Sequence, residues 1–339
     1  MKKGNSNWKP LIGGGLVGVL IVVCIAVIGA VILYQKPLGS ALNISSRSAP
    51  VATPTTAAVI PVAPAPTNTP VGVCGETAVW NVLVLGSDAA DLYYPQGSDL
   101  TRVVRVDFQN KKVSIYSFSR DLWMDTSDLG LTNPSIESAK LGMVFYEARL
   151  RSTKTDPNDA IQDGIGAMAK TLATNFTLKS NHYIVLDLDK FPAMIDTIGG
   201  LPINIPSGFT DPLSGMVFTA GEQTLNGLQT ANYARAFVDT DLNRIPRDNL
   251  VVEALRQKLL DPAVWVKIPE LFLKFKDAVN TDFSPEQVNH LACLLKEVQV
   301  GSIVQDGVKA EWTSPGPEGS LLWDKPNVLN RLKELGMIP

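Results

Sequence analysis

Histidine and cysteine are scarce in this chain, with 2 and 3 residues among 339. So few of these ligands leave little material for a zinc site. The sequence also has no CxxC, HExxH, GxSxG or P-loop motif, so it carries no signature of a redox dithiol, a zinc protease, an α/β-hydrolase or a P-loop nucleotide site. A formal net charge of −3 argues against a general nucleic-acid-binding protein.

Charge is absent from one long stretch near the N-terminus, residues 11–34. At about 1.5 Å per residue, a helix over this stretch is roughly 36 Å long, which is enough to cross a bilayer. Lys2, Lys3 and Lys9 precede it, so we expect residues 1–10 to form a cytoplasmic tail and the main domain to lie outside a single-pass membrane anchor. A cleaved signal peptide and a buried core helix are the alternatives.

Periodic hydrophobicity is missing from residues 35–73, which are rich in proline, threonine and alanine. This composition is typical of an extended linker. We expect a folded domain over residues 74–300 and a C-terminal extension over residues 301–339.

Apolar runs bounded by turn residues predict strands at 80–85, 100–108, 112–118, 182–188 and 201–205, the second and third forming a hairpin. Helical spacing predicts helices at 158–176, 189–198, 250–260, 268–279, 284–298 and 327–335. Residues 301–312 are consistent with a strand pair. Such a mixture indicates an α/β (mixed α+β) domain with a central, mainly antiparallel or mixed sheet flanked by helices.

Two of the three cysteines, Cys74 and Cys293, lie in the part of the chain expected outside the membrane. Disulfides persist in that environment, so we predict that these two residues pair. The alternative is a pair of buried free thiols.

Carboxylates stand at the ends of the first two predicted strands, Asp88 after one and Asp99 before the next. Neighbouring strand ends bring such residues to one edge of a sheet. Two carboxylates together with waters and a phosphate are a common way to hold Mg²⁺. Aspartates in ordinary turns are the alternative interpretation.

Arginines follow further along the chain, and the first is Arg120, beside Asp121 at the end of the third strand. Residues 232–249 then contain Arg235, Arg244 and Arg247 among several aspartates, directly before an apolar helical run. Cations are unfavourable at a helix N-terminus, so their presence there suggests an anion held by both the arginines and the helix. Structural Arg–Asp pairs are the alternative for both segments.

Taken together, six segments resemble the LytR–CpsA–Psr family of cell-envelope phosphotransferases in order and spacing. They are NVLVLGSD, GSDLTRVVRVD, KKVSIYSFSRD, HYIVLDLDKFPAMIDTIGGLPINIP, FTAGEQTLNGLQTANYARA and DTDLNRIPRDN. The resemblance extends over residues 79–298, and a membrane anchor fits the family too. It implies transfer of a glycopolymer from a polyprenyl-pyrophosphate carrier to peptidoglycan, with the lipid tail in an apolar tunnel between the sheet and its helices.

The resemblance also implies roles for individual residues. Asp88 and Asp99 match magnesium ligands, and Arg120 matches an arginine that contacts the pyrophosphate, with Asp121 supporting it. The other phosphate-facing arginines match Arg235, Arg244 and Arg247. Asp241 matches an aspartate that orients the acceptor hydroxyl or holds an arginine.

Four positions depart from the family pattern. Gly97 and Phe237 stand where the family usually has arginine, Asp248 where it has glutamine, and Glu137 where asparagine is expected. Arg102 or Arg105 could compensate for the lost positive charge, depending on which face of the strand each occupies. The departures keep two rival hypotheses open: a non-catalytic relative that binds polyprenyl phosphates or envelope glycans, and a polyprenyl-pyrophosphate hydrolase.

Overall fold

The computed structural model describes residues 39–42, 73–87, 97–129, 137–154, 157–236, 238, 242, 244–265, 267–275 and 278–339. The predicted cytoplasmic tail, the predicted membrane span and most of the predicted linker lie outside these ranges. Within them, no helix is long and apolar enough to cross a bilayer.

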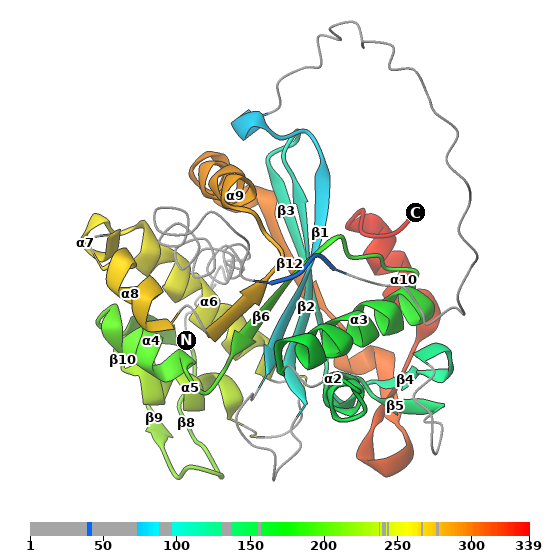
Figure 1. Ribbon diagram of the computed structural model, residues 1–339. Helices are drawn as coiled ribbons and strands as arrows, with labels where there is room; N and C mark the ends of the chain where they lie inside the picture. Colours follow the sequence, from blue (N-terminus) through cyan, green and yellow to red (C-terminus); the bar gives the residue numbers. More distant parts are fainter. Residues whose placement is uncertain are drawn as a thin grey trace, which may run out of the picture.

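A six-stranded mixed sheet forms the centre of the molecule, with strand order β11-β6-β1-β2-β3-β12 (Figure 1). Its strands are β1 (Val79–Ser87), β2 (Ser98–Asp107), β3 (Lys112–Phe118), β6 (His182–Asp187), β11 (Val279–Thr281) and β12 (Ile303–Gly307). The pairs β1/β2, β2/β3 and β6/β11 are antiparallel, whereas β1/β6 and β3/β12 are parallel. The predicted mainly antiparallel or mixed sheet and its β2–β3 hairpin are therefore confirmed.

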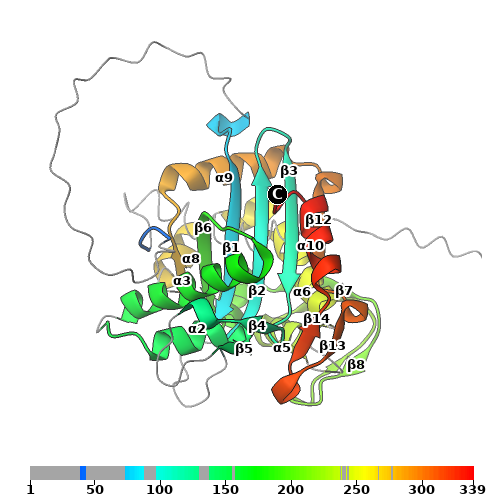
Figure 2. The same cartoon turned by 90° about the vertical axis from the view of Figure 1, so that its right-hand side faces the viewer.

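Helices cover both faces of this sheet (Figures 1 and 2). One face carries α2 (Leu141–Leu150), α3 (Pro157–Phe176) and α10 (Lys325–Glu334), and the other carries α4 (Phe191–Thr197), α5 (Gly227–Arg235), α6 (Arg244–Leu260), α8 (Ile268–Phe275) and α9 (Pro285–Glu297). Because both faces are covered, the strands are apolar on both sides: Val82 and Val84 face one core, and Leu83 and Leu85 face the other.

The remaining elements are short. Four small two-stranded sheets pair β4 (Trp123–Asp125) with β5 (Ser138–Lys140), β7 (Leu201–Ile205) with β10 (Gly221–Leu225), β8 (Phe209–Thr210) with β9 (Val217–Phe218), and β13 (Thr313–Pro315) with β14 (Leu321–Trp323). Helix α7 covers Pro262–Trp265, and short 3₁₀ turns occupy Val73–Gly75, Ser127–Leu129, Val300–Ser302, Ala310–Trp312 and Pro317–Gly319.

Two predicted elements differ from the structure near the C-terminus. The helix expected over 268–279 ends at Phe275, and Val279 instead begins strand β11 on the edge of the sheet. The strand pair expected over 301–312 is wrong. Residues Ile303–Gly307 form a single strand that pairs with β3, because β3 offers a free edge to receive it, and Ala310–Trp312 is helical.

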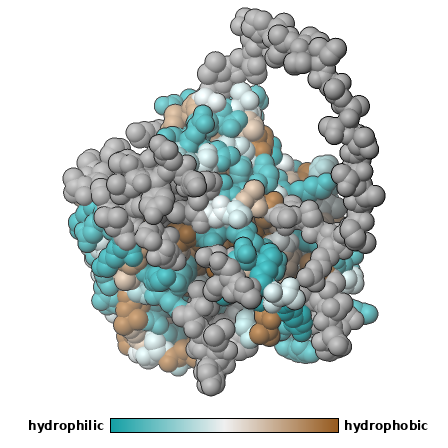
Figure 3. Space-filling view, viewed as in Figure 1, coloured by the Kyte–Doolittle hydropathy of each residue, from teal (hydrophilic) through white to brown (hydrophobic). Residues whose placement is uncertain are grey.

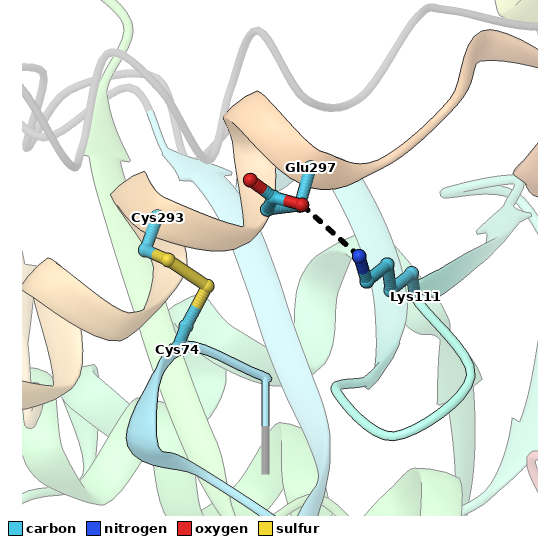
Figure 4. The surroundings of a disulfide bond; sticks show 4 residues. All are labelled: Cys74, Lys111, Cys293 and Glu297. Atoms are coloured by element: carbon cyan, nitrogen blue, oxygen red, sulfur yellow. Dashed lines mark hydrogen bonds and ion pairs between the residues drawn. A yellow bond between two sulfur atoms is a disulfide. The ribbon is translucent and has the colours of Figure 1, made fainter.

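A disulfide joins Cys74 to Cys293, with their Cα atoms 5.6 Å apart (Figure 4). It fastens the segment before β1 to α9, and the predicted pairing is thereby confirmed. Lys111 and Glu297 form an exposed ion pair nearby, 3.0 Å between Nζ and Oε2. The disulfide and this pair both connect α9 to the same end of the sheet.

Hydrophobic side chains are exposed at the end of the molecule where β8, β9 and α5 lie (Figure 3). Leu213, Val217 and Leu228 are 81%, 70% and 57% exposed. The opposite end of the sheet, with the disulfide, is distant from this surface (Figure 1).

Candidate functional site

Three neighbouring strands bring candidate residues to one end of the sheet. β1 ends at Ser87, β2 begins at Ser98 and β3 ends at Phe118, and these three ends are adjacent in the antiparallel register. Asp99 and Arg120 are located at this end. Two other predicted site residues, Asp88 and Asp241, lie outside the described residues.

Asp99 is almost fully buried and lies at the centre of an arginine cluster formed by Arg120, Arg235 and Arg244. Its Oδ1 accepts a hydrogen bond from Arg120 Nη1, and its Oδ2 lies 3.8 Å from Arg235 Nη2. Its backbone oxygen accepts a hydrogen bond of 2.8 Å from Arg244 Nη2. One residue therefore ties together β2, the segment after β3, the end of α5 and the start of α6.

An apolar pocket opens beside this cluster, between β6, α4, α5 and α6, with a cavity volume of about 90 Å³. The side chains that line its interior include Leu100, Leu186, Leu188, Phe191, Val252 and Leu255. Five charged residues are grouped at one end: Asp99, Arg102, Arg235, Arg244 and Asp248. The pocket is therefore amphipathic, apolar along its length and charged at one end.

Arg102 lines the pocket, whereas the sequence alone did not decide whether Arg102 or Arg105 would face it. Arg102 shares a strand face with Val104 and Val106, and its side chain is completely buried against α6. Arg105, on the other face of β2, packs against Gly336 and lies 3.7 Å from Asp107. An arginine within a strand that is covered on both faces is unusual and could have indicated a functional residue. Periodicity places Arg102 and Arg105 on opposite faces but does not say which face meets the pocket.

Two further candidates point elsewhere. Arg247 donates to the backbone oxygen of Ala236 and lies over the ring of Phe209, 5.3 Å from its centroid. Burial is the largest cause of its lowered pKa. Asp121 lies 3.6 Å from Lys140 Nζ, so its carboxylate is directed to β5. Although Arg244 and Arg247 are three residues apart on one helix, only Arg244 lines the pocket.

Gly97 lies so close to the backbone at the start of α2 that there is no room for a side chain. Its φ is +65°, and a Cβ atom there would lie 1.8 Å from the carbonyl oxygen of Gly142, at the start of α2. An arginine is therefore incompatible with this backbone. The departure from the resembled pattern at this position is structural, because α2 occupies the space beside it.

Comparison with known proteins identifies the family. The model of the LytR_cpsA_psr family matches residues 62–323, which is most of the chain. The chain belongs to the LytR_cpsA_psr family. The resemblance inferred from the sequence motifs is thus confirmed.

Curated relatives share the central part of the chain. The regulatory protein MsrR of Staphylococcus aureus is 29% identical over 207 residues, which cover 60% of this chain and 56% of MsrR. A teichoic acid transferase from Enterococcus faecalis, TagU, is 25% identical over 233 residues, covering 67% of this chain and 69% of TagU. TagU is named as transferring teichoic acid from a polyisoprenyl-linked form to peptidoglycan. The chain spans little more than half the length of MsrR.

Solved structures support the family's fold. B. subtilis TagV aligns with a TM-score of 0.59 at 19% identity, covering 78% of this chain and 99% of TagV. The LytR-Csp2A-Psr enzyme of Actinomyces oris aligns with a TM-score of 0.53 at 15% identity, covering 74% and 89%. At these identities, the comparison extends to the fold alone.

The predicted magnesium site is represented among the described residues by Asp99. No group of three or more His, Cys, Asp or Glu side chains in those residues is arranged to hold a metal. Magnesium commonly takes one or two carboxylates and fills its other positions with water and phosphate. Asp99 offers a carboxylate of the right chemistry, and in the structure its two oxygens face Arg120 and Arg235.

Proposed function

We propose that this chain is a membrane-anchored enzyme that transfers a glycopolymer from a polyprenyl-pyrophosphate carrier to peptidoglycan. The observation that carries the proposal is the pocket, which is apolar along its length and lined by arginines at one end. A prenyl pyrophosphate has the matching chemistry, an apolar tail and an anionic head. The name of the relative TagU, a polyisoprenyl-teichoic acid–peptidoglycan transferase, agrees with this substrate class.

In the proposal, the arginines bind the pyrophosphate. Arg235 and Arg244 line the charged end of the pocket, and Arg120 reaches the same place through Asp99. Guanidinium groups form strong, often bidentate hydrogen bonds to phosphate oxygens. Such groups also stabilise the charge that develops during phosphoryl transfer, where positioning and neutralisation are the main work of the protein.

The proposed reaction forms one bond and breaks one. An acceptor hydroxyl oxygen bonds to the phosphorus on the glycan side, the bridging P–O bond breaks, and prenyl monophosphate leaves. The hydroxyl proton needs a base, and we propose Asp241 for this role; the resemblance matches it to an aspartate that orients the acceptor hydroxyl or holds an arginine. Asp88 and Asp99 would hold Mg²⁺, which when bound adds further neutralisation of the pyrophosphate charge.

The proposed location is the cell membrane, with the N-terminus in the cytoplasm and the main domain outside. Lysines before the uncharged stretch at 11–34 support that orientation. The Cys74–Cys293 disulfide also supports it, because disulfides persist in oxidising compartments.

The test is turnover by the full chain, purified in detergent, with a radiolabelled polyprenyl-pyrophosphate glycan, Mg²⁺ and peptidoglycan fragments. We expect label to appear on peptidoglycan together with prenyl monophosphate. In Arg235→Met the transfer rate should fall at least about tenfold, because the loss of a hydrogen bond to a charged group costs roughly 1.5–3 kcal/mol. Arg105→Met, on the far face of β2, is the matched control and should keep the rate.

Two outcomes would contradict the proposal and identify the rivals. Retention of the lipid with no turnover by the wild-type chain indicates a binding protein. Release of prenyl monophosphate at the same rate without peptidoglycan indicates a hydrolase.

A further inference from the structure

Arg102 is the most deeply buried charged residue at the pocket, with 0% of its surface exposed. Its Nη1 donates a hydrogen bond of 3.2 Å to Asn249 Oδ1. Its Nη2 lies 3.6 Å from Asp248 Oδ2, which is an ion pair but too long for a hydrogen bond. The contacts on α6 thus hold one side of the guanidinium.

The rest of the guanidinium has unfilled hydrogen-bonding capacity within the described part of the chain. Among the described residues, neither Nε nor Nη2 of Arg102 has a hydrogen-bond partner, and the same holds for Oγ of nearby Ser117. Both residues line a second small hollow together with Asp99 and Arg244. Buried donors without partners are costly, and each one in a native structure calls for an explanation.

Structural stabilisation is a poor explanation for this arginine. A buried ion pair is often no more stable than apolar side chains of the same size, and Arg102 shares its strand face with the core residues Val104 and Val106. Arg244 is also a like charge nearby: after burial, which lowers the pKa of Arg102, and Asp248, which raises it, Arg244 lowers it further. A buried arginine with unfilled donors beside a second positive charge is an arrangement that an anion would relieve.

We propose that Arg102 is a further anion-binding residue of this pocket, held in place by Asp248 and Asn249, and that it binds a phosphate oxygen of the substrate together with Arg244. The inference rests on the proposed function, because it assigns a ligand group to the same pocket. Asp248 then has a second effect. As the partner of Arg102 it offsets part of the positive charge that the phosphate would otherwise meet.

This arrangement predicts opposite effects for the two members of the pair. Removing the positive charge with Arg102→Met should weaken phosphate binding, whereas removing the negative charge with Asp248→Asn should strengthen it. A pair that only stabilises the fold predicts no such opposition, since breaking it from either side removes the same interaction.

The experiment is calorimetric titration of the full chain in detergent with two probes, inorganic pyrophosphate and geranylgeranyl pyrophosphate, at low and at physiological salt. We expect Arg102→Met to raise both Kd values about tenfold or more and Asp248→Asn to lower them about two- to fivefold. Arg102→Lys keeps the charge and should stay within about threefold of the wild type. Arg105→Met makes the same substitution on the same strand but on the opposite face, and it should leave both Kd values unchanged.

The possible failures are distinguishable. If the wild-type chain binds the probes and Arg102→Met binds them equally well, the inference about Arg102 is overturned while the proposed pocket stands. Shifts in the same direction for Arg102→Met and Asp248→Asn overturn it as well. If the wild-type chain binds neither probe, the proposed function falls and the inference falls with it. Melting curves identify a variant that has lost its fold, and in that case Arg102→Lys and Asp248→Asn decide the question.

Discussion

Gly97 shows how a single residue limits the composition of the site. With φ at +65° and the oxygen of Gly142 in the place of a Cβ, the residue tolerates no side chain. The arginine that the resembled pattern would place there is therefore excluded by the close approach of α2 to the start of β2. The positive charge beside Asp99 comes instead from Arg120, Arg235 and Arg244.

Substitution of Gly97 by alanine tests this contact. We expect Gly97→Ala to lower the melting temperature strongly, because the steric overlap adds to the cost of a positive φ, which alone is on the order of 1–3 kcal/mol. Gly215 is the matched control, since its φ is +71° and no atom lies within 4 Å of the added Cβ. Equal destabilisation of Gly97→Ala and Gly215→Ala would show that the approach of α2 does not matter.

At the level of elements, the sequence predicted the scaffold better than the site. The runs Lys112–Phe118 and Leu201–Ile205 were predicted with the bounds that the structure has, because apolar runs between turn residues are a local signal. The helix predicted over 250–260 begins earlier than expected, at Arg244. The contacts of the site are not local. The backbone oxygen of Asp99 accepts a hydrogen bond from Arg244, 145 residues further along the chain, and no periodicity in the sequence predicts such a contact.

The same limitation explains why some predicted groupings differ from the geometry. Arg244 and Arg247 were expected to bind the same anion. In the structure Arg247 instead contacts the ring of Phe209 and the carbonyl oxygen of Ala236, and it does not line the pocket. Asp121 follows Arg120 directly, but successive side chains diverge, so it meets Lys140 while Arg120 meets Asp99. Which of Arg102 and Arg105 faces the pocket depended on the strand's register within a sheet covered on both sides.

Helix α5 offers a test of the pocket as a lipid site. Ala234 lines the pocket, so Ala234→Phe should fill part of it and exclude a prenyl chain. We expect the Kd for geranylgeranyl pyrophosphate to rise at least about tenfold, or ~1.4 kcal/mol, while the Kd for inorganic pyrophosphate stays the same. Asn232→Phe adds the same ring to the same helix outside the pocket lining and should change neither value. Equal weakening of both probes by Ala234→Phe would argue against a lipid-binding role.

At the scale of the whole molecule, late segments of the chain complete the sheet and tie it together. Strands β11 and β12 form its two edges, and β12 belongs to residues 301–339, which the sequence analysis described as a C-terminal extension. The disulfide then fastens the segment before β1 to α9 across a sequence separation of 219 residues. The folded domain is thus closed by contacts between its beginning and its end.

Removing the disulfide should therefore destabilise the whole domain. For Cys74→Ser with Cys293→Ser we expect a loss of about 2–4 kcal/mol in the free energy of unfolding, measured by denaturant titration, because the unfolded chain loses a long covalent loop. Reductant should lower the stability of the wild-type chain to that of the variant and leave the variant unchanged. If reductant has no effect on the wild type, the two cysteines are not paired in the purified protein.

The most direct test of the central claim is a crystal structure of the chain with geranylgeranyl pyrophosphate bound. We expect the pyrophosphate within hydrogen-bonding distance of Arg235 and Arg244, and the prenyl chain between Leu186 and Val252. Binding of the lipid at any other surface, with the pocket empty at saturating ligand, would contradict the claim that this pocket receives the carrier.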